Sequence, residues 1–277
     1  MATNSTLQLP KVTVVTVVRN GQSVIEETIL SVLDQDYPNI EYIVVDGDSK
    51  DDTCSIIQRY RERIARFVSE PDNGIYDAMN KAAEMASGEW IVYMNAGDAF
   101  YEKASISRLL PSLRSDADVI FAGVEEVLQD DVETRRFQRM PSAIERIWKQ
   151  MPTSHQATFV RANVQRAYKF DTRYVWCADH DLLARLYRDR KTFVSEPCLF
   201  CVFDCGGGRS RDPVLFIKER WRLSAGLVAW PKRLLHYGYE WCHCSIWGRC
   251  VRFLKQFLSP SMIVRLRRLR GTSGVRA

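Results

Sequence analysis

Short runs rich in β-branched residues recur along the first half of the chain. The segments 11–18, 40–45 and 90–94 are each long enough for one strand and contain few polar residues, which is typical of parallel strands buried on both faces. Residues 118–123 form a further run of this kind. Because helical periodicity separates the runs, the pattern predicts an α/β fold with a mainly parallel sheet flanked by helices.

The segments between these strands carry apolar residues at helical spacing. Ser23 and Glu26 have the spacing of a capping box, so a helix is expected to begin at Ser23. A later helix is expected at 75–86, with Gly88 as its C-terminal stop. Its apolar positions are Ile75, Met79, Ala82, Ala83 and Ala86. A strand at 135–140 follows an acidic, hairpin-like loop and is expected to be antiparallel, which makes the sheet mixed.

Acidic residues follow these strands. Asp46 and Asp48 come after the second strand, and the polar tetrapeptide 95–98, Asn-Ala-Gly-Asp, ends the strand at 90–94. Ligands of open α/β sheets bind beyond the carboxyl ends of the strands. A carboxylate there can hold a divalent cation that carries a phosphate, or can accept hydrogen bonds from a ribose or a base. The competing interpretation of 95–98 is an ordinary turn, because Asn, Gly and Asp all favour turns.

Two nucleotide-binding motifs are missing from the sequence. No G-x-G-x-x-G follows the first strand, and no G-x-x-x-x-G-K-[ST] is present. A dinucleotide-binding fold and a P-loop NTPase are therefore both disfavoured.

A second group of polar residues lies in the segment 176–186. Asp179 and Asp181 are expected in the first turn of a helix, where the helix dipole stabilises a negative charge. Either Asp179 simply caps that helix, or one of the two acids is a general base whose pKa is raised by an apolar neighbour such as Trp176. His155 is expected to be a hydrogen-bonded structural residue.

Basic residues are concentrated near the end of the chain. Residues 213–277 contain thirteen Lys or Arg and only two acidic residues, whereas the whole chain has a net charge of +5. Helices are expected at 215–229, 251–258 and 262–270, interleaved with aromatic residues. Cationic helices with aromatic faces fit an anionic membrane surface. Nucleic acid is the competing partner, but nothing upstream resembles a nucleic-acid module. The third interpretation of these helices is an extension that packs on the domain and binds no partner.

No apolar leader and no run of about 18 apolar residues is visible, so a cytoplasmic protein is expected, peripheral on the inner face of the cytoplasmic membrane. The eight cysteines are then expected to be thiols rather than disulfides. Those at 198, 201 and 205 lack the paired spacing of a structural zinc site.

Five motifs, taken together, resemble the family 2 glycosyltransferases with their GT-A nucleotide-sugar fold. They are V-T-V-V-R-N ending at 20, I-V-V-D-G-D-S ending at 49, D-N-G-I-Y-D-A-M-N ending at 80, W-I-V-Y-M-N-A-G-D ending at 98 and A-D-H-D-L ending at 182. Their order and spacing agree with that family over about 11–210, which sets a transferase domain of 1–210 and a basic helical extension of 211–277. The chain looks most similar to bacterial transferases of exopolysaccharide (colanic-acid-type), O-antigen or lipopolysaccharide assembly.

The resemblance implies a role for each matching residue on the donor side. The implied donor contacts are Val17 and Arg19 beside the nucleobase, Asp46 toward the base or ribose, Asp77 and Asn80 over the donor, and Asn95, Ala96 and Gly97 in the metal motif. The family usually has Asp-x-Asp there, whereas this chain has Asn95 and Gly97 at the acidic positions. Asp98 is then the implied ligand of a divalent cation, Mn²⁺ or Mg²⁺, and Asp179 stands at the place of the catalytic base.

The activity implied by the resemblance is inverting sugar transfer from a nucleoside-diphosphate donor, in the first instance a UDP-sugar. The implied acceptor is a hydroxyl of an oligosaccharide or of a lipid-linked polysaccharide. Two alternatives stay open on sequence alone. One is a non-catalytic partner in a polysaccharide-assembly complex, and the other is a sugar-nucleotidyltransferase of the same fold class, which would need a Gly-rich basic loop near the first strand.

Overall fold

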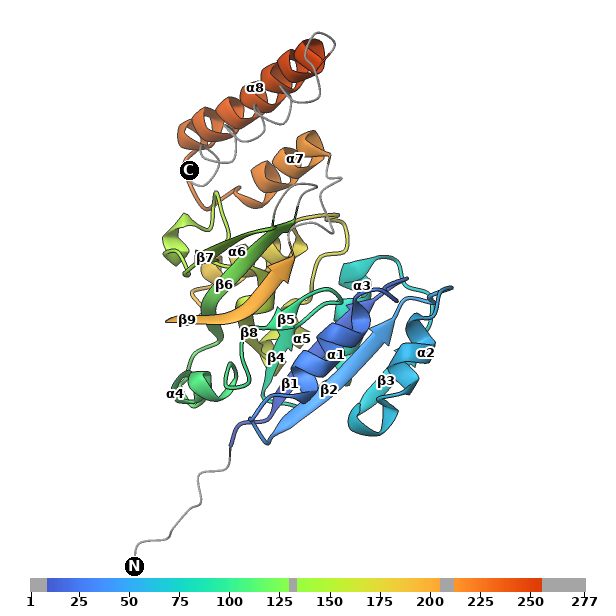
Figure 1. The fold of residues 1–277 in the computed structure, drawn as a ribbon. Coiled ribbons are helices and arrows are strands. Elements are labelled where there is room, and N and C mark those ends of the chain that lie inside the picture. Colours follow the sequence, from blue (N-terminus) through green and yellow to red (C-terminus); the bar gives the residue numbers. More distant parts are fainter. Residues whose placement is uncertain (1–8, 130–133, 205–211, 256–277) are drawn as a thin grey trace, which may run out of the picture. The chain divides into compact units, whose positions relative to one another are not determined.

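The computed structural model describes residues 9–129, 134–204 and 212–255 (Figure 1). The chain divides into two compact units, Met1–Arg211 and Asp212–Ala277. This division lies one residue from the boundary predicted from the sequence. Each unit is described separately below.

The first unit is built on one mixed sheet of nine strands among its described residues. Four strands are parallel, in the order β3 (Arg66–Ser69), β2 (Ile40–Asp46), β1 (Val12–Val18) and β4 (Trp90–Tyr93). The order continues through β8 (Thr158–Arg161), β6 (Val119–Gln129), β9 (Phe193–Asp204) and β5 (Ala99–Phe100), while β7 (Thr134–Arg139) pairs with β6. Since β7 runs antiparallel to β6, the predicted mixed, mainly parallel sheet is confirmed.

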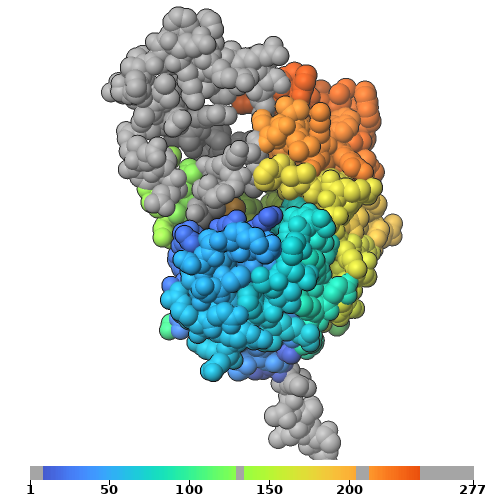
Figure 2. Space-filling model, turned by 90° about the vertical axis from the view of Figure 1, so that its right-hand side faces the viewer, coloured from blue at the N-terminus to red at the C-terminus, as the bar shows by residue number. Residues whose placement is uncertain are grey.

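Helices cover both faces of this sheet (Figure 1). On one face α1 (Ile25–Leu33) and α2 (Thr53–Gln58) contact each other, and elsewhere α3 (Ile75–Met85) contacts α5 (Ala162–Tyr168). The remaining helical elements are α4 (Leu110–Leu113), α6 (Ala178–Arg188) and the short 3₁₀ turns Arg61–Arg63, Ser107–Leu109, Ile144–Arg146 and His155–Ala157. In Figure 2, residues of the N-terminal part of the chain, blue to cyan, gather on one face of the first unit.

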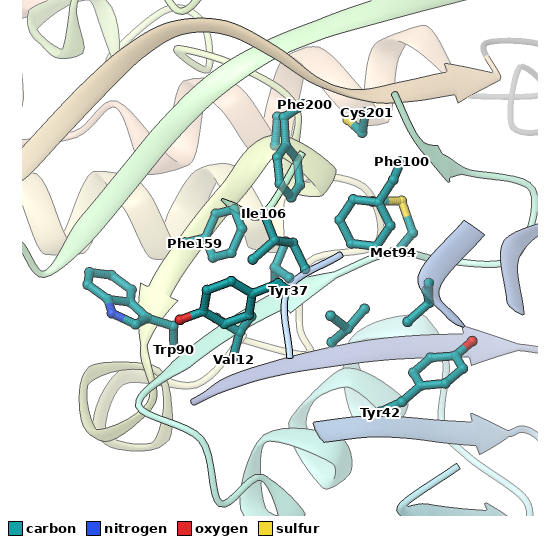
Figure 3. Packing of buried hydrophobic residues seen from close by; sticks show 14 of the residues in the cluster. Val12, Tyr37, Tyr42, Trp90, Met94, Phe100, Ile106, Phe159, Phe200 and Cys201 are labelled. Carbon is teal, nitrogen blue, oxygen red and sulfur yellow. The ribbon is translucent and has the colours of Figure 1, made fainter. Parts of the chain in front are cut away.

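The core explains why the strand sequences are so apolar. Every residue of β1 and β4 is buried, because helices cover the sheet on both sides. Aromatic rings then join strands that are distant in sequence (Figure 3). Phe200 packs edge-to-face on Phe159 and Phe100, with ring centroids 4.9 and 5.1 Å apart, an arrangement that favours one ring geometry beyond simple burial.

Three local predictions about helices α1 and α3 are wrong. Helix α1 begins at Ile25 after Val24, without a side-chain cap, so the capping box expected at Ser23 does not form. Ile75 stands at the first position of α3 and is 47% exposed, so it does not belong to the inner face that Met79 and its neighbours form.

Gly88 does not stop α3, which ends at Met85 with an extended residue as its cap. Its small size matters for another reason. A Cβ at this position would lie 2.6 Å from Thr13 Oγ1 and 2.8 Å from the Lys11 carbonyl oxygen. Gly88 therefore lets the chain entering β4 approach β1 closely.

The second unit contains α7 (Pro213–Leu223) and α8 (Trp230–Lys255). Asp212 caps α7 by accepting the backbone N–H groups of Val214 and Leu215, so the helix expected at 215–229 begins and ends earlier than predicted. Helix α8 begins well before the amphipathic segment expected at 251–258. The segment expected at 262–270 lies outside the described residues. Within the described part of the chain, no helix combines the length and apolarity that a membrane span requires.

Candidate active site

The carboxyl ends of β1 and β2 form one edge of the sheet, because Val18 pairs with Asp46 in parallel register. Arg19 follows β1 and is exposed, whereas Val17 is only 5% exposed and belongs to the core. Gly47 lies between Arg19 and Asp72: a Cβ there would be 3.4 Å from Arg19 Cβ and 2.4 Å from Asp72 Oδ2. Asp72, to which the sequence motifs assigned no role of its own, thus stands at the predicted donor edge.

Asp46 is fully buried at this edge, and its carboxylate is hydrogen-bonded to neighbouring residues of the protein. It accepts hydrogen bonds from the backbone and hydroxyl of Ser49, from the Ser69 hydroxyl at 2.7 Å and from the Cys54 thiol at 3.2 Å. Burial alone would raise the pKa of the Asp46 carboxyl, but these hydrogen bonds outweigh burial and lower it. In this structure Asp46 holds the loop after β2, and its surroundings do not favour the expected direct contact with a base or ribose.

The tetrapeptide 95–98 is a turn. The Asp98 N–H donates to the Asn95 carbonyl oxygen at 2.9 Å, and Gly97 has φ of +99°, a left-handed value that type II turns require at their third residue. The buried hydroxyl of Thr28 on α1 fixes this turn, since it accepts from the Gly97 N–H at 3.0 Å and donates to the Asp98 carbonyl at 2.8 Å. Ala96 and Gly97 remain half-buried at the edge of the sheet.

Asp98 does not offer the surroundings of a metal ligand. Its side chain is 6% exposed, and Oδ2 accepts the amide N–H of Gln156 at 2.7 Å. Its charge also acts on buried Cys201, whose pKa is raised first by burial and then by Asp98. No group of three or more His, Cys, Asp or Glu in the described ranges is placed to hold a metal ion. The described residues therefore do not fit a cation held by protein ligands alone.

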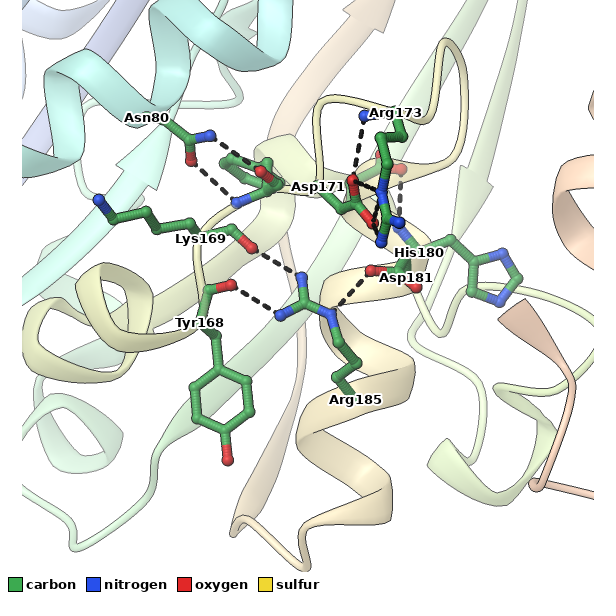
Figure 4. Close-up of polar contacts among 10 residues, drawn as sticks. Asn80, Tyr168, Lys169, Asp171, Arg173, His180, Asp181 and Arg185 are labelled. Carbon is green, nitrogen blue, oxygen red and sulfur yellow. Dashed lines mark hydrogen bonds and ion pairs between the residues drawn. The ribbon is translucent and has the colours of Figure 1, made fainter. Parts of the chain in front are cut away.

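Asp77 and Asn80, expected over the donor, make hydrogen bonds within the protein in this structure. Asp77 accepts the Asn73 N–H at 2.9 Å and so fixes the turn before α3. Asn80 donates to the Phe170 carbonyl at 2.9 Å and accepts the Phe170 N–H at 2.8 Å (Figure 4). Because both amide atoms of Asn80 are used, this side chain connects α3 to the segment that precedes α6.

Asp179 lies in the first turn of α6 and is 15% exposed, within reach of residues from two other elements. His155 Nδ1 is 3.3 Å from Asp179 Oδ2, and the Tyr76 hydroxyl on α3 is 3.4 Å from Oδ1. His155 Nε2 in turn lies 2.9 Å from Asn95 Nδ2. A chain of polar contacts therefore runs from the end of β4 to the predicted base.

The pKa of Asp179 is lower than its ordinary value, not higher as predicted. Burial raises the pKa of Asp179, but the hydrogen bonds from His155 and from the His180 N–H are among the effects that together outweigh burial. The prediction considered only an apolar neighbour, Trp176, whereas the neighbours that decide the shift are polar. Asp179 is thus a carboxylate at neutral pH.

Asp181, the other acid of this segment, belongs to the scaffold. It accepts from Arg185 Nε at 2.7 Å, and the same guanidinium donates to the carbonyls of Tyr168 and Lys169, each at 2.7 Å (Figure 4). The residue that precedes α6 is Cys177, with no side-chain cap, so the interpretation of Asp179 as the helix cap is not supported. The two acids therefore separate into a site residue and a structural one.

From the sequence His155 was expected to be structural, but in the fold it contacts the predicted base Asp179. The segment around it contained the signal, since His155 and Gln156 are consecutive polar residues in front of the buried strand β8. His155 reaches Asp179, and Gln156 reaches Asp98. Only the fold brings these pairs together.

The cysteines are free thiols wherever their side chains are described, at positions 54, 177, 198, 201 and 242. This agrees with the prediction. Burial raises the pKa of the Cys198 thiol, as it does for Cys201.

The family model described as glycosyl transferase family 2 matches residues 13–171, more than half of the chain. The chain belongs to this family.

Relatives and solved structures agree with that assignment. The chain is 32% identical over 138 residues to the putative teichuronic acid biosynthesis glycosyltransferase TuaG of Bacillus subtilis, covering 49% of this chain and 55% of that protein. It is 29% identical over 216 residues to the uncharacterized glycosyltransferase Rv1514c of Mycobacterium tuberculosis, covering 74% and 79%. The chain thus spans only about half the length of TuaG.

Two solved structures share the fold. S. aureus TarS 1-349 in complex with UDP-GlcNAc superposes with a TM-score of 0.62 at 18% identity, covering 85% of this chain and 73% of that one. The mannosyltransferase PcManGT from Pyrobaculum calidifontis, in complex with GDP-Man and Mn²⁺, gives 0.63 at 17% identity, covering 96% and 81%. At these identities the likeness establishes the GT-A fold and nothing finer.

Proposed function

We propose that this protein is an inverting glycosyltransferase that moves a sugar from a nucleoside diphosphate, in the first instance a UDP-sugar, to a hydroxyl of a growing saccharide. The observation that carries the proposal is the ionised, largely buried Asp179, which His155 connects to Asn95 at the end of β4. Arg19, Gly47 and Asp72 form the proposed nucleobase side of the donor site. The family relationship and the fold shared with nucleotide-sugar complexes support this assignment.

Asp179 suits the role of general base although its pKa is low. A free hydroxyl is a poor nucleophile, but it becomes far more acidic as its oxygen bonds to the oxocarbenium-like anomeric carbon. A carboxylate that is already ionised can then accept the proton late in the step. One displacement breaks the bond to the leaving diphosphate and forms the new glycosidic bond on the opposite face, which inverts the anomeric centre.

The test is Asp179→Asn, which keeps the shape and removes the base. Turnover of a panel of UDP- and GDP-sugars is expected to fall by about 10²–10⁴-fold, while nucleotide binding, measured by thermal shift, persists. Asp116→Asn, on an exposed loop, is the matched control and should retain full activity. Unchanged turnover in the Asp179 variant, or a product with retained configuration, would refute the proposal. Nucleotide binding without turnover of any donor in the wild type would favour the non-catalytic partner.

The second unit supports a lipid-linked acceptor at an anionic membrane surface. Two polar side chains of α8 contact α7: Glu240 accepts from Arg220 at 2.9 Å, and Arg233 donates to the Trp221 carbonyl at 2.7 Å. Over 230–243, the part of α8 whose side chains are described, most of the exposed residues are apolar. They include Trp230, Leu234, Leu235, Tyr239 and Trp241, from 45% to 76% exposed.

Aromatic and aliphatic side chains beside Lys and Arg are the composition of an interfacial helix. Flotation with vesicles that contain phosphatidylserine tests this interaction, and binding is expected to weaken with added salt. Leu235→Glu with Tyr239→Glu should abolish flotation, whereas Leu30→Glu, at an exposed position of α1, should not. Equal flotation of all three proteins would refute the membrane contact.

A further inference from the structure

In the contact chain Asn95–His155–Asp179, the donor and acceptor of each hydrogen bond follow from the chemistry of the side chains. The carboxylate of Asp179 can only accept hydrogen bonds, so His155 Nδ1, 3.3 Å away, has to carry the hydrogen. In a neutral imidazole Nε2 is then an acceptor. The atom facing Nε2, at 2.9 Å, is Asn95 Nδ2, a donor. The contact with Asp179 requires the hydrogen on Nδ1 of His155, and this tautomer leaves Nε2 able to accept from Asn95. The two contacts therefore favour the same tautomer.

We infer that Asn95 and His155 are positioning residues for the proposed base: Asn95 sets the tautomer of His155, and His155 orients Asp179. This inference rests on the proposed function, since it concerns the carboxylate assigned there as the base. It also assigns Asn95 a role that an acidic residue could not take in the same way. An Asp side chain has no N–H to offer Nε2, so the usual first residue of the metal motif would break the chain at this point.

Burial and anchoring make the arrangement rigid. Asn95 is 8% exposed, and its backbone carbonyl accepts the Asp98 N–H in the turn that Thr28 fixes. His155 begins the 3₁₀ turn His155–Ala157, directly before β8. On the opposite side of Asp179, the Tyr76 hydroxyl donates to the Trp176 carbonyl at 3.0 Å as well as reaching Oδ1. A small displacement of such a base is costly, because catalysis depends on alignment of the reacting atoms.

The tautomer can be measured without any activity. ¹⁵N NMR of the full chain separates protonated from unprotonated imidazole nitrogens, and each of the four histidines can be assigned from its His→Gln variant. His155 is expected to carry its hydrogen on Nδ1 at neutral pH. His180 is an internal reference of the opposite kind, since its Nε2 faces the Ile147 carbonyl and has to carry a hydrogen. A His155 protonated on Nε2, or on both nitrogens, would overturn the inference.

Two variants of Asn95 test the connection. In Asn95→Asp an acceptor faces Nε2, so the NMR spectrum should show His155 protonated on both nitrogens. In Asn95→Leu the donor is lost, and kcat should fall by about a hundredfold with the donor KM unchanged. Unaltered NMR signals in Asn95→Asp, or a change in KM alone in Asn95→Leu, would contradict the role.

A double-mutant cycle separates this inference from the proposed function. Asn95→Leu should cause no further loss of kcat in a His155→Asn background, because residues that act through one chain are not additive. Additive losses would exclude the chain while leaving Asp179 as the base. Full activity of Asp179→Asn would instead remove the proposed function and leave the NMR result on the tautomer standing.

Discussion

Asn80 distinguishes a donor contact from a structural role more sharply than any other residue of the five motifs. Its amide makes two hydrogen bonds to the backbone of Phe170, a residue that is itself 5% exposed. Asn80→Ala removes both and leaves a buried N–H and a buried carbonyl without their partner. At about 1 kcal/mol for each hydrogen bond, and more where a group stays unsatisfied, the free energy of unfolding should fall by about 2–4 kcal/mol.

Urea unfolding followed by tryptophan fluorescence measures this change, and an unchanged m-value would show that the midpoint reports stability. Glu84→Ala is the matched control, because Glu84 joins α3 to Lys169 by an ion pair at 2.8 Å in which both side chains are more than half exposed. Such a pair should contribute little. The reasoning fails if Asn80→Ala leaves stability intact and instead weakens nucleotide binding, as expected of a donor contact.

Three further outcomes follow from the structure. Gly88→Ala places a methyl group against Thr13 and Lys11 and should destabilise the first unit by about 1–3 kcal/mol; an unchanged unfolding midpoint would contradict the close approach. Because the pKa of Asp46 is lowered on folding, its stabilising effect is complete above the unfolded value of about 3.9 and is lost as the pH falls through the folded value. Asp46→Asn should therefore flatten the acid limb of a stability–pH curve, and an acid limb as steep as that of the wild type would contradict this. Millimolar Mn²⁺ or Mg²⁺ should leave the melting temperature of the nucleotide-free protein unchanged, whereas a clear rise would indicate a protein-held cation site that the described residues do not show.

The sequence was sufficient to predict the fold class because burial on both faces leaves a strong local mark. Strands such as β1 and β4 are continuous apolar runs, and the turns between elements interrupt them. Helix ends were less predictable. Whether Ser23 caps α1 or Ile75 packs inward depends on the direction in which the neighbouring loop arrives, and no local pattern records that direction.

The candidate site was only partly predictable for the same physical reason. Asp179 is marked by its position in a motif, but its ionisation depends on His155, 24 residues away. Asn80 resembles a donor contact until its partner, 90 residues away, is known. Asp98 has the residue type of a metal ligand, but one of its oxygens accepts a hydrogen bond from Gln156, 58 residues away. Residue type identifies which groups can do chemistry, whereas long-range hydrogen bonds decide which of them are free to do it.

The Thr28 hydroxyl has a consequence for protein engineering. Because this single group satisfies both the Gly97 N–H and the Asp98 carbonyl, helix α1 and the turn after β4 form one exchangeable block. A chimera that carries residues 95–98 of another family member will keep the conformation of this turn only if the residue at position 28 has a hydroxyl. Conversely, a replacement of α1 without its hydroxyl would loosen the turn on which Asn95 stands, although no residue of the motif itself had been altered.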